Sequence, residues 1–305
     1  MTSVEAERQA SPASTRSEAG EQQEARAAMG AGDGPVGEGA MIPERGDGVL
    51  ARGGRDAGTA PDPYATKPVF YQVSTLNALM MGNMDGVVTA GELKRHGAWG
   101  IGTYEGLDGE AIVCDGQAYN AHADGTACEY PDDARLAFAT VANFTNRAAQ
   151  FGICGAASID EAKDALDTAR RTFDDNDNAW ALVAVRGSYP HLRVRSCEKW
   201  PSKPYPPFAE LASNQHEHAY EHETGWVVGV WVPEYLQGIN MPGWHLHFLS
   251  DDRRRGGHLL ELSVARAEGR LETYARFAMD LPTNREFDKL DLAEDLARET
   301  RSVEG

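Results

Sequence analysis

Three Asp-Gly dipeptides most strongly limit the folds open to this chain. They are Asp108-Gly109, Asp115-Gly116 and Asp124-Gly125, and they separate short apolar runs. Asp-Gly is favoured at the tight turn of a β-hairpin, because both residues tolerate the positive φ that such turns require. This stretch therefore predicts a β-meander.

Helical signals are fewer than strand signals. Ser74 precedes apolar residues at helical spacing, Thr89-x-x-Glu92 is typical of a capping box, and Ser158-x-x-Glu161 caps a longer helix. A last helix is expected near 285–299. Further strands are expected at about 179–187, 191–197, 224–233, 243–249, 257–265 and 269–277. The predicted class is α+β: two β-rich halves with mixed or antiparallel sheets, flanked by a few helices.

The first 66 residues differ in composition from the rest. They are dominated by Ala, Gly, Glu, Arg, Ser and Pro and contain almost no aromatic or branched apolar residues. Such a segment buries too little surface to offset the entropy lost on ordering. We expect residues 1–66 to form a disordered acidic tail and residues 67–305 to form the catalytic domain.

Charge and hydropathy narrow the possible partners and location. The net charge of -18 argues against a nucleic acid or an anionic membrane as a partner, because either would repel this acidic protein. No apolar run approaches the ~20 residues that span a bilayer, and the N-terminus lacks the apolar stretch of a signal peptide. The expected location is cytoplasmic. The four cysteines are widely spaced, and we expect them to be small buried hydrophobic residues.

Three histidines, His245, His247 and His258, predict a divalent metal site. Side chains alternate along a β-strand, so His245 and His247 share one face while Trp244 and its alternating neighbours face a core. A turn at 250–257 can then place His258 beside His247. Three neutral imidazoles with an open fourth position are typical of catalytic zinc.

A second histidine cluster lies upstream. His216-Glu217-His218 is followed by Glu221-His222-Glu223, and these groups could also bind a transition metal. The segment is strongly polar, and we interpret it as a solvated loop or edge.

From Val69 to the C-terminus the chain resembles alpha-acetolactate decarboxylases. The resemblance rests on several blocks that follow one another in the family's order. They are Tyr71–Met80, Gly91–Gly97, Gly100–Tyr104 leading to Leu107–Glu110, Lys203–Pro207, Gly238–Phe248 and Gly256–His258.

The resemblance implies a role for individual residues. It makes His245, His247 and His258 the ligands of Zn²⁺, although three histidines would accept other divalent metals. It implies that Glu110 is catalytic and that Thr103 binds the substrate. It also implies an arginine that binds the carboxylate, for which we choose Arg195 over Arg193. A C-terminal glutamate falls on Glu304, with Glu299 as the alternative.

The implied reaction is the decarboxylation of 2-acetolactate to acetoin. The metal would chelate the hydroxyl and ketone oxygens and stabilise an enediolate as carbon dioxide leaves. Arg195 would bind the carboxylate, and Glu110 and Glu304 would handle protons. The family also implies a homodimer. Two alternatives remain open from the residues: a cupin-like metal enzyme, which also has His-x-His on a strand, and a non-catalytic metal-binding protein.

Overall fold

The computed structural model describes residues 67–293, 295–298 and 300. The predicted tail, Glu299 and Glu304 lie outside the described residues. Within these residues, no helix combines the length and apolar character needed to cross a membrane.

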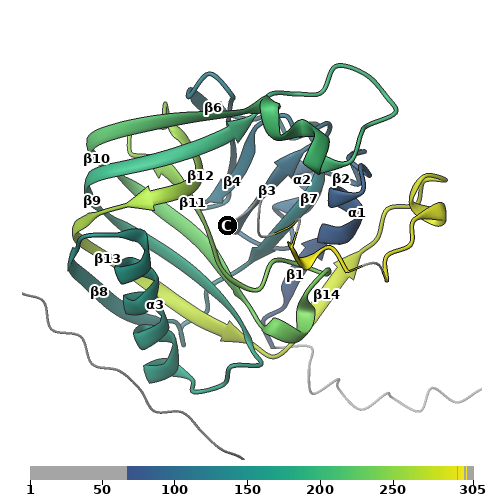
Figure 1. Ribbon diagram of the computed structural model, residues 1–305. Helices are drawn as coiled ribbons and strands as arrows, with labels where there is room; N and C mark the ends of the chain where they lie inside the picture. Colours follow the sequence, from purple (N-terminus) through teal and green to yellow (C-terminus); the bar gives the residue numbers. More distant parts are fainter. Residues whose placement is uncertain (1–66, 294, 299, 301–305) are drawn as a thin grey trace, which may run out of the picture. The chain divides into compact units, whose positions relative to one another are not determined.

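Two β-sheets form the framework (Figure 1). The first has eight strands in the order β14-β1-β7-β3-β4-β5-β6, with β2 paired to β7. Its only parallel pair among the described strands is β1 with β14. Its strands are β1 (Phe70–Val73), β2 (Val88–Thr89), β3 (Trp99–Tyr104), β4 (Glu110–Cys114), β5 (Gln117–Ala121), β6 (Ala127–Glu129), β7 (Arg135–Ala142) and β14 (Phe277–Asp280).

The Asp-Gly turns confirm the predicted meander. They join β3 to β4, β4 to β5 and β5 to β6, and all three strand pairs are antiparallel. At the second turn both Asp115 and Gly116 have positive φ, 52° and 78°. This is the backbone of a two-residue hairpin turn, and it suits the Asp-Gly pair.

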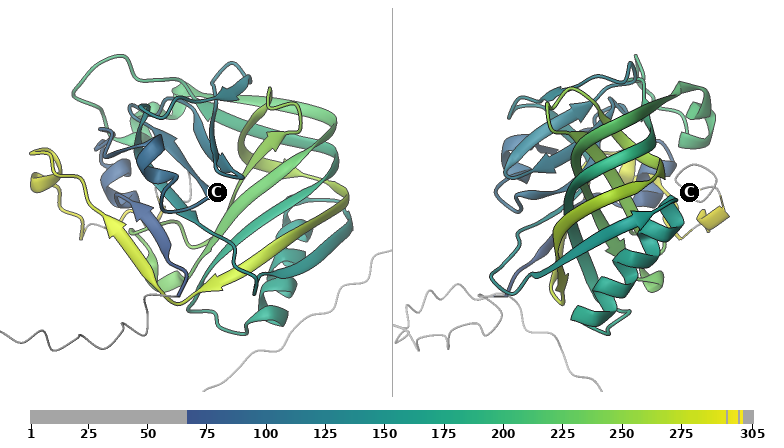
Figure 2. Two further views of the ribbon diagram at one scale, coloured as in Figure 1. Left: turned by 180° about the vertical axis from the view of Figure 1, so that it is seen from behind. Right: turned by 90° about the vertical axis from the view of Figure 1, so that its left-hand side faces the viewer.

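The second sheet has the order β10-β11-β12-β9-β13-β8, and β10 pairs with β9 as well. The ladder thus runs from β9 through β10, β11 and β12 and returns to β9. Figure 2 shows these strands coiling strongly, with α3 beside them. The strands are β8 (Ala149–Ala156), β9 (Trp180–Cys197), β10 (Gln215–Val232), β11 (Gly243–Ser250), β12 (Gly256–Leu262) and β13 (Val264–Tyr274).

Alternation along β9 builds two cores. Trp180, Leu182 and Ala184 join a cluster that also contains residues of the first sheet. Ala181 and Val183 point to the opposite face, where α3 covers the second sheet. The period-2 pattern therefore buries both faces of this strand.

The helices are short apart from α3. The capping boxes predicted a helix after Thr89 and one after Ser158, and both are confirmed, whereas the first helix is capped by Thr75 instead of Ser74. The described helical segments are α1 (Leu76–Met80), α2 (Ala90–Leu93), α3 (Ile159–Phe173), and the 3₁₀ turns η1 (Phe208–Asn214), η2 (Glu234–Leu236) and η3 (Phe287–Lys289).

Two details of the prediction are wrong. The strands expected at 179–187 and 191–197 are one strand, β9, because Pro190 is accommodated opposite His222, whose φ is 58°. The helix expected near 285–299 is not continuous: its described part contains η3, a turn at 292–293 and helical residues at 297–298. Thr300 is also helical and donates its N–H to the carbonyl oxygen of Leu296 at 2.8 Å. Asp291 accepts a hydrogen bond from the Ala293 N–H, which favours a turn there. Asp295 accepts from the Ala297 N–H just before the helical residues, so it caps a separate short helical segment.

Candidate active site

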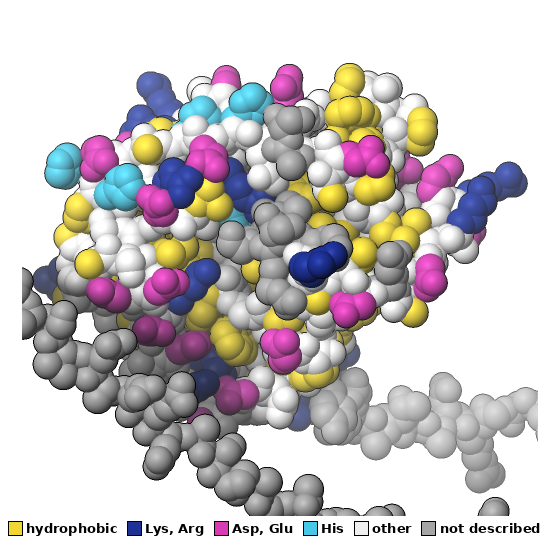
Figure 3. All heavy atoms as spheres, viewed as in Figure 1, with side chains coloured by type: hydrophobic (Ala, Val, Ile, Leu, Met, Phe, Trp, Pro, Cys, Tyr) yellow, Lys and Arg dark blue, Asp and Glu magenta, His cyan; other side chains and the backbone are white. Residues whose placement is uncertain are grey.

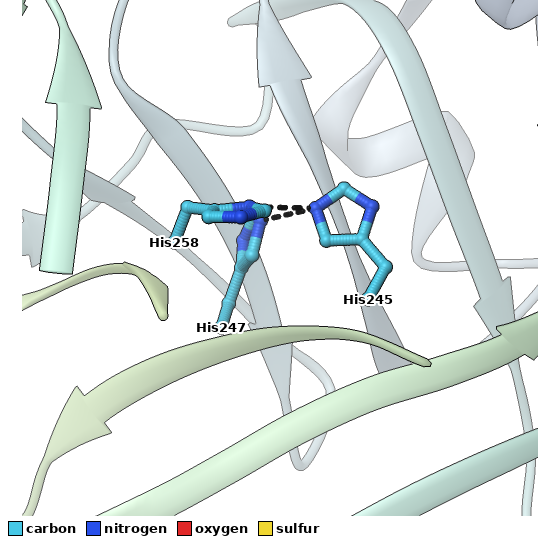
Figure 4. Close-up of side chains that lie close together, drawn as sticks. All are labelled: His245, His247 and His258. Atoms are coloured by element: carbon cyan, nitrogen blue, oxygen red, sulfur yellow. Dashed lines mark hydrogen bonds between the residues drawn. The ribbon is translucent and has the colours of Figure 1, made fainter. Parts of the chain in front are cut away.

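The three histidines converge as their spacing predicts (Figure 4). Trp244, Leu246 and Phe248 lie in the core covered by α3, so His245 and His247 share the other face of β11. The β11–β12 pairing sets His258 directly opposite His247. The Nε2 atom of His245 lies 3.1 Å from Nε2 of His247 and 2.9 Å from Nδ1 of His258.

All three imidazoles are buried, and burial keeps His245 and His258 neutral. The exposed fractions are 9% for His245, 1% for His247 and 4% for His258. Burial, reinforced by the nearby positive charge of Arg195, lowers the pKa of His245 from 6.5 to about 3. The same two causes lower the pKa of His258 well below its ordinary value. Neutral imidazole is the form that binds metals.

The histidine group fits a metal ion. Its three ligand nitrogens lie within 4.8 Å of one another, and no second group of this kind occurs among the described residues. The Nδ1 atom of His247 lies 3.1 Å from the carbonyl oxygen of Ala111. Because a carbonyl can only accept, Nδ1 carries the proton and Nε2 keeps its lone pair for the ion.

Glu110 lies beside this group. It is the first residue of β4, is 9% exposed, and has Oε2 3.5 Å from Nε2 of His247. Its neighbour across the ladder is Thr103 of β3, whose hydroxyl donates to the carbonyl of Gly109 at 2.8 Å. The first sheet thus supplies the carboxylate, and the second sheet supplies the imidazoles.

The structure separates the two candidate arginines. Arg195 is 3% exposed and lies opposite His258 in the β9–β12 ladder. Arg193 is partly exposed and forms ion pairs with Glu217 and Glu261. The buried Arg195 is therefore the one beside the histidines.

A cavity opens between Glu110 and His245. Thr103 also lines it, and the other lining residues are Leu76, Leu79, Gly102, Leu107, Phe138, Cys197 and Phe208. The sequence prediction did not assign Phe138 or Phe208 to the site. Phe208 directly follows the Lys203–Pro207 block, and this position next to a family block could have indicated that it belongs to the site.

The second histidine cluster is exposed. His216 and His218 lie on β10 where only β9 pairs with it, so the segment is an edge and the alternative of a loop is wrong. His218 Nε2 contacts the carbonyl oxygen of Ala123 at 2.9 Å, and Glu217 pairs with Arg193. Figure 3 shows histidine, acidic and basic side chains gathered on this surface.

The family follows from a direct match. Residues 70–294 match the model of the alpha-acetolactate decarboxylase family. The chain belongs to this family. The match covers nearly all the described residues and confirms the resemblance found in the sequence blocks.

Individual relatives agree with the family. The alpha-acetolactate decarboxylase of Methanosarcina mazei is 36% identical over 236 residues, which cover 77% of this chain and 80% of the relative. That of Methylococcus capsulatus is 37% identical over 223 residues, 73% of this chain and 84% of the relative.

Solved structures of the family share the fold. A Staphylococcus aureus protein described as similar to alpha-acetolactate decarboxylase has a TM-score of 0.71 and 32% identity, covering 77% of this chain and 100% of its own. The Bacillus subtilis alpha-acetolactate decarboxylase has a TM-score of 0.72 and 27% identity, covering 77% and 99%. Membership of this family decides against the cupin alternative.

Proposed function

We propose that this protein decarboxylates 2-acetolactate to acetoin. The observation that carries the proposal is the meeting of three buried histidines with Glu110 and the buried Arg195, in a chain whose curated relatives are named alpha-acetolactate decarboxylase. A metal-storage protein has no need of a carboxylate and a guanidinium beside the ligands.

Zn²⁺ is the metal we propose, held by His245, His247 and His258. Three histidines are a known catalytic zinc set, and they also suit other divalent ions. Bound there, the ion would supply a Lewis acid that withdraws electron density from the oxygens of the substrate.

Arg195 is proposed to orient the substrate through its carboxylate. The planar guanidinium can donate two parallel hydrogen bonds to a carboxylate, and burial strengthens this attraction because little water screens it. When the bond from C2 to the carboxylate breaks, carbon dioxide leaves and the electron pair spreads into the adjacent ketone.

Glu110 is proposed to transfer protons at this stage. After carbon dioxide leaves, C2 must gain a proton, and Glu110 lines the cavity. Glu304 is proposed as a second proton-transferring carboxylate on the basis of the resemblance, and it lies outside the described residues. The homodimer also stays a prediction.

The test is acetoin formation by purified protein. Metal-free protein and protein loaded with zinc are given 2-acetolactate without oxygen, and acetoin and carbon dioxide are measured. We expect equal amounts of both products from the zinc-loaded protein only. Stoichiometric zinc binding without acetoin would contradict the proposal and favour the non-catalytic alternative.

A further inference from the structure

The cavity beside the histidines is lined by two chemically different groups of side chains. Glu110, Thr103 and His245 are the polar group. Leu76, Leu79, Leu107, Phe138 and Phe208 are the apolar group. A ligand that satisfies both groups combines several polar groups with short alkyl groups.

We propose that Phe208 sets the size limit for the alkyl group at C2 of the substrate. This inference rests on the proposed function, because it names which 2-hydroxy-3-keto acids the same site accepts. The hydroxyl and ketone of such an acid require polar groups, and its carboxylate requires Arg195. Its C2 alkyl group then contacts the apolar lining.

The small space makes the apolar lining selective. The volume of the cavity is about 20 Å³, room for about one water molecule, so these side chains must move apart to admit a substrate, and a bulkier C2 group needs a larger displacement. In a closely packed site even one additional methylene group causes steric strain. In an apolar pocket, two substrates that differ by one methylene group differ in kcat/KM by roughly 10- to 200-fold.

Phe208 lies on a different kind of element from the other apolar lining residues. The others lie on α1, the β3–β4 turn and β7, and Phe208 begins the 3₁₀ turn η1 after a Pro-rich segment. It is 3% exposed and packs with Leu76 and Leu79 in one apolar cluster. Its ring can be shortened without removing a residue of either sheet.

Leu211 provides a matched control in the same turn. It is 2% exposed and belongs to the same apolar cluster, but it is not among the described residues that line the cavity. Loss of its side chain should loosen η1 without enlarging the cavity. Phe208→Ala and Leu211→Ala therefore separate the size of the site from the packing of the turn.

The experiment measures kcat/KM for acetolactate homologues with methyl, ethyl and propyl groups at C2. Zinc-loaded wild type, Phe208→Ala and Leu211→Ala are compared, and Phe208→Leu serves as a milder change if the alanine variant does not fold. We expect Phe208→Ala to raise kcat/KM for the larger homologues relative to the methyl compound by at least about 10-fold. Phe208→Leu should shift the ratio in the same direction, and Leu211→Ala should change it less than about twofold.

Two results would overturn the inference. One is an unchanged ratio in a folded Phe208 variant, and the other is an equal shift in Leu211→Ala. A wild-type protein that is inactive on every homologue would instead contradict the proposed function, so the two failures are distinguishable.

Discussion

Arg193 and Arg195 lie two positions apart in one strand, and their surroundings predict opposite responses to substitution. Arg195 is buried beside His258, and Arg193 is partly exposed between two carboxylates. Arg195→Lys removes the two-pronged donor and should lower kcat/KM by roughly 10- to 100-fold, the effect of about 1.5–3 kcal/mol for hydrogen bonds to a charged group. Arg193→Lys should stay within about twofold of wild type, as surface ion pairs are weak. Equal losses in steady-state kinetics would show that the assignment is wrong.

Thr103 can act through the backbone as well as on the substrate. Its hydroxyl donates to the Gly109 carbonyl, in the turn that leads directly to Glu110. Thr103→Val keeps the shape and removes this hydrogen bond, so kcat should fall about 5- to 10-fold, equivalent to about 1–1.4 kcal/mol. Thr103→Ser keeps the hydroxyl and should retain the wild-type kcat. If KM rises in the valine variant while kcat is unchanged, the hydroxyl binds the substrate instead of supporting the turn.

The sequence predicts part of this site for a simple physical reason. The two-residue period of a strand places His245 and His247 together, and the turn at 250–257 places His258 opposite. Glu110 comes from the other sheet, so no local pattern could bring it to His247; only the family resemblance indicated it. Phe208 has no periodic neighbours, and its place in the cavity depends on tertiary packing.

At the scale of elements, α3 stabilises the second sheet from the face opposite the histidines. Its N-cap Ser158 accepts a hydrogen bond from the Glu161 N–H at 3.2 Å. Ser158→Ala should reduce the free energy of unfolding by about 1 kcal/mol. Activity at 25 °C should be unchanged, because α3 contacts the core of Trp244 and Leu246 and not the face of His245. Urea denaturation measures the first effect, and Ser158→Thr, which keeps a hydroxyl, is the control. Loss of turnover in a folded Ser158→Ala protein would contradict this separation.

Element prediction succeeded where local and tertiary preferences agree. The Asp-Gly turns, the capping box at Thr89 and the N-cap Ser158 are signals that depend on adjacent residues only, and each was confirmed. The predicted last helix is interrupted, because Asp291 binds the backbone N–H of Ala293 in a turn and Asp295 caps a separate helical segment after it. The break predicted at 188–190 does not occur, because β10 pairs with β9 on either side of Pro190 and His222 opposite it adopts a positive φ.

The C-terminal segment gives a second prediction at this scale. Deletion of Glu304 and Gly305 should lower kcat by at least about 100-fold, within the usual contribution of a general acid or base. The melting temperature is measured alongside, and a fall in kcat at an unchanged melting temperature assigns the loss to the reaction and not to the fold. Glu304→Gln tests the carboxyl group alone, and Glu299→Gln is the matched control. A fully active truncation would exclude Glu304 from the reaction.

For the whole molecule, protons would compete with the proposed zinc ion for the same buried imidazoles. Burial and Arg195 lower the pKa of His245 in the folded protein to about 3, against 6.5 in the unfolded chain. Below pH ~6.5 the unfolded chain therefore binds a proton that the folded protein does not, and the free energy of unfolding decreases as pH falls. The decrease reaches about 1.4 kcal/mol per pH unit for each such histidine. His258 adds to it in the same direction.

Zinc should make the free energy of unfolding depend more strongly on pH, since the metal binds only the neutral ligands. At 100 times its dissociation constant, zinc should raise the free energy of unfolding by about 2.7 kcal/mol at pH 7.5, and by less at pH 5. Urea denaturation with and without zinc at both pH values measures the effect. His245→Gln should abolish the gain, whereas His191→Gln should keep it, because His191 is an exposed histidine paired with Glu221 and Glu261. A zinc-dependent gain that survives His245→Gln would show that the metal is bound elsewhere in the molecule, and the exposed histidines of β10 would then be tested next.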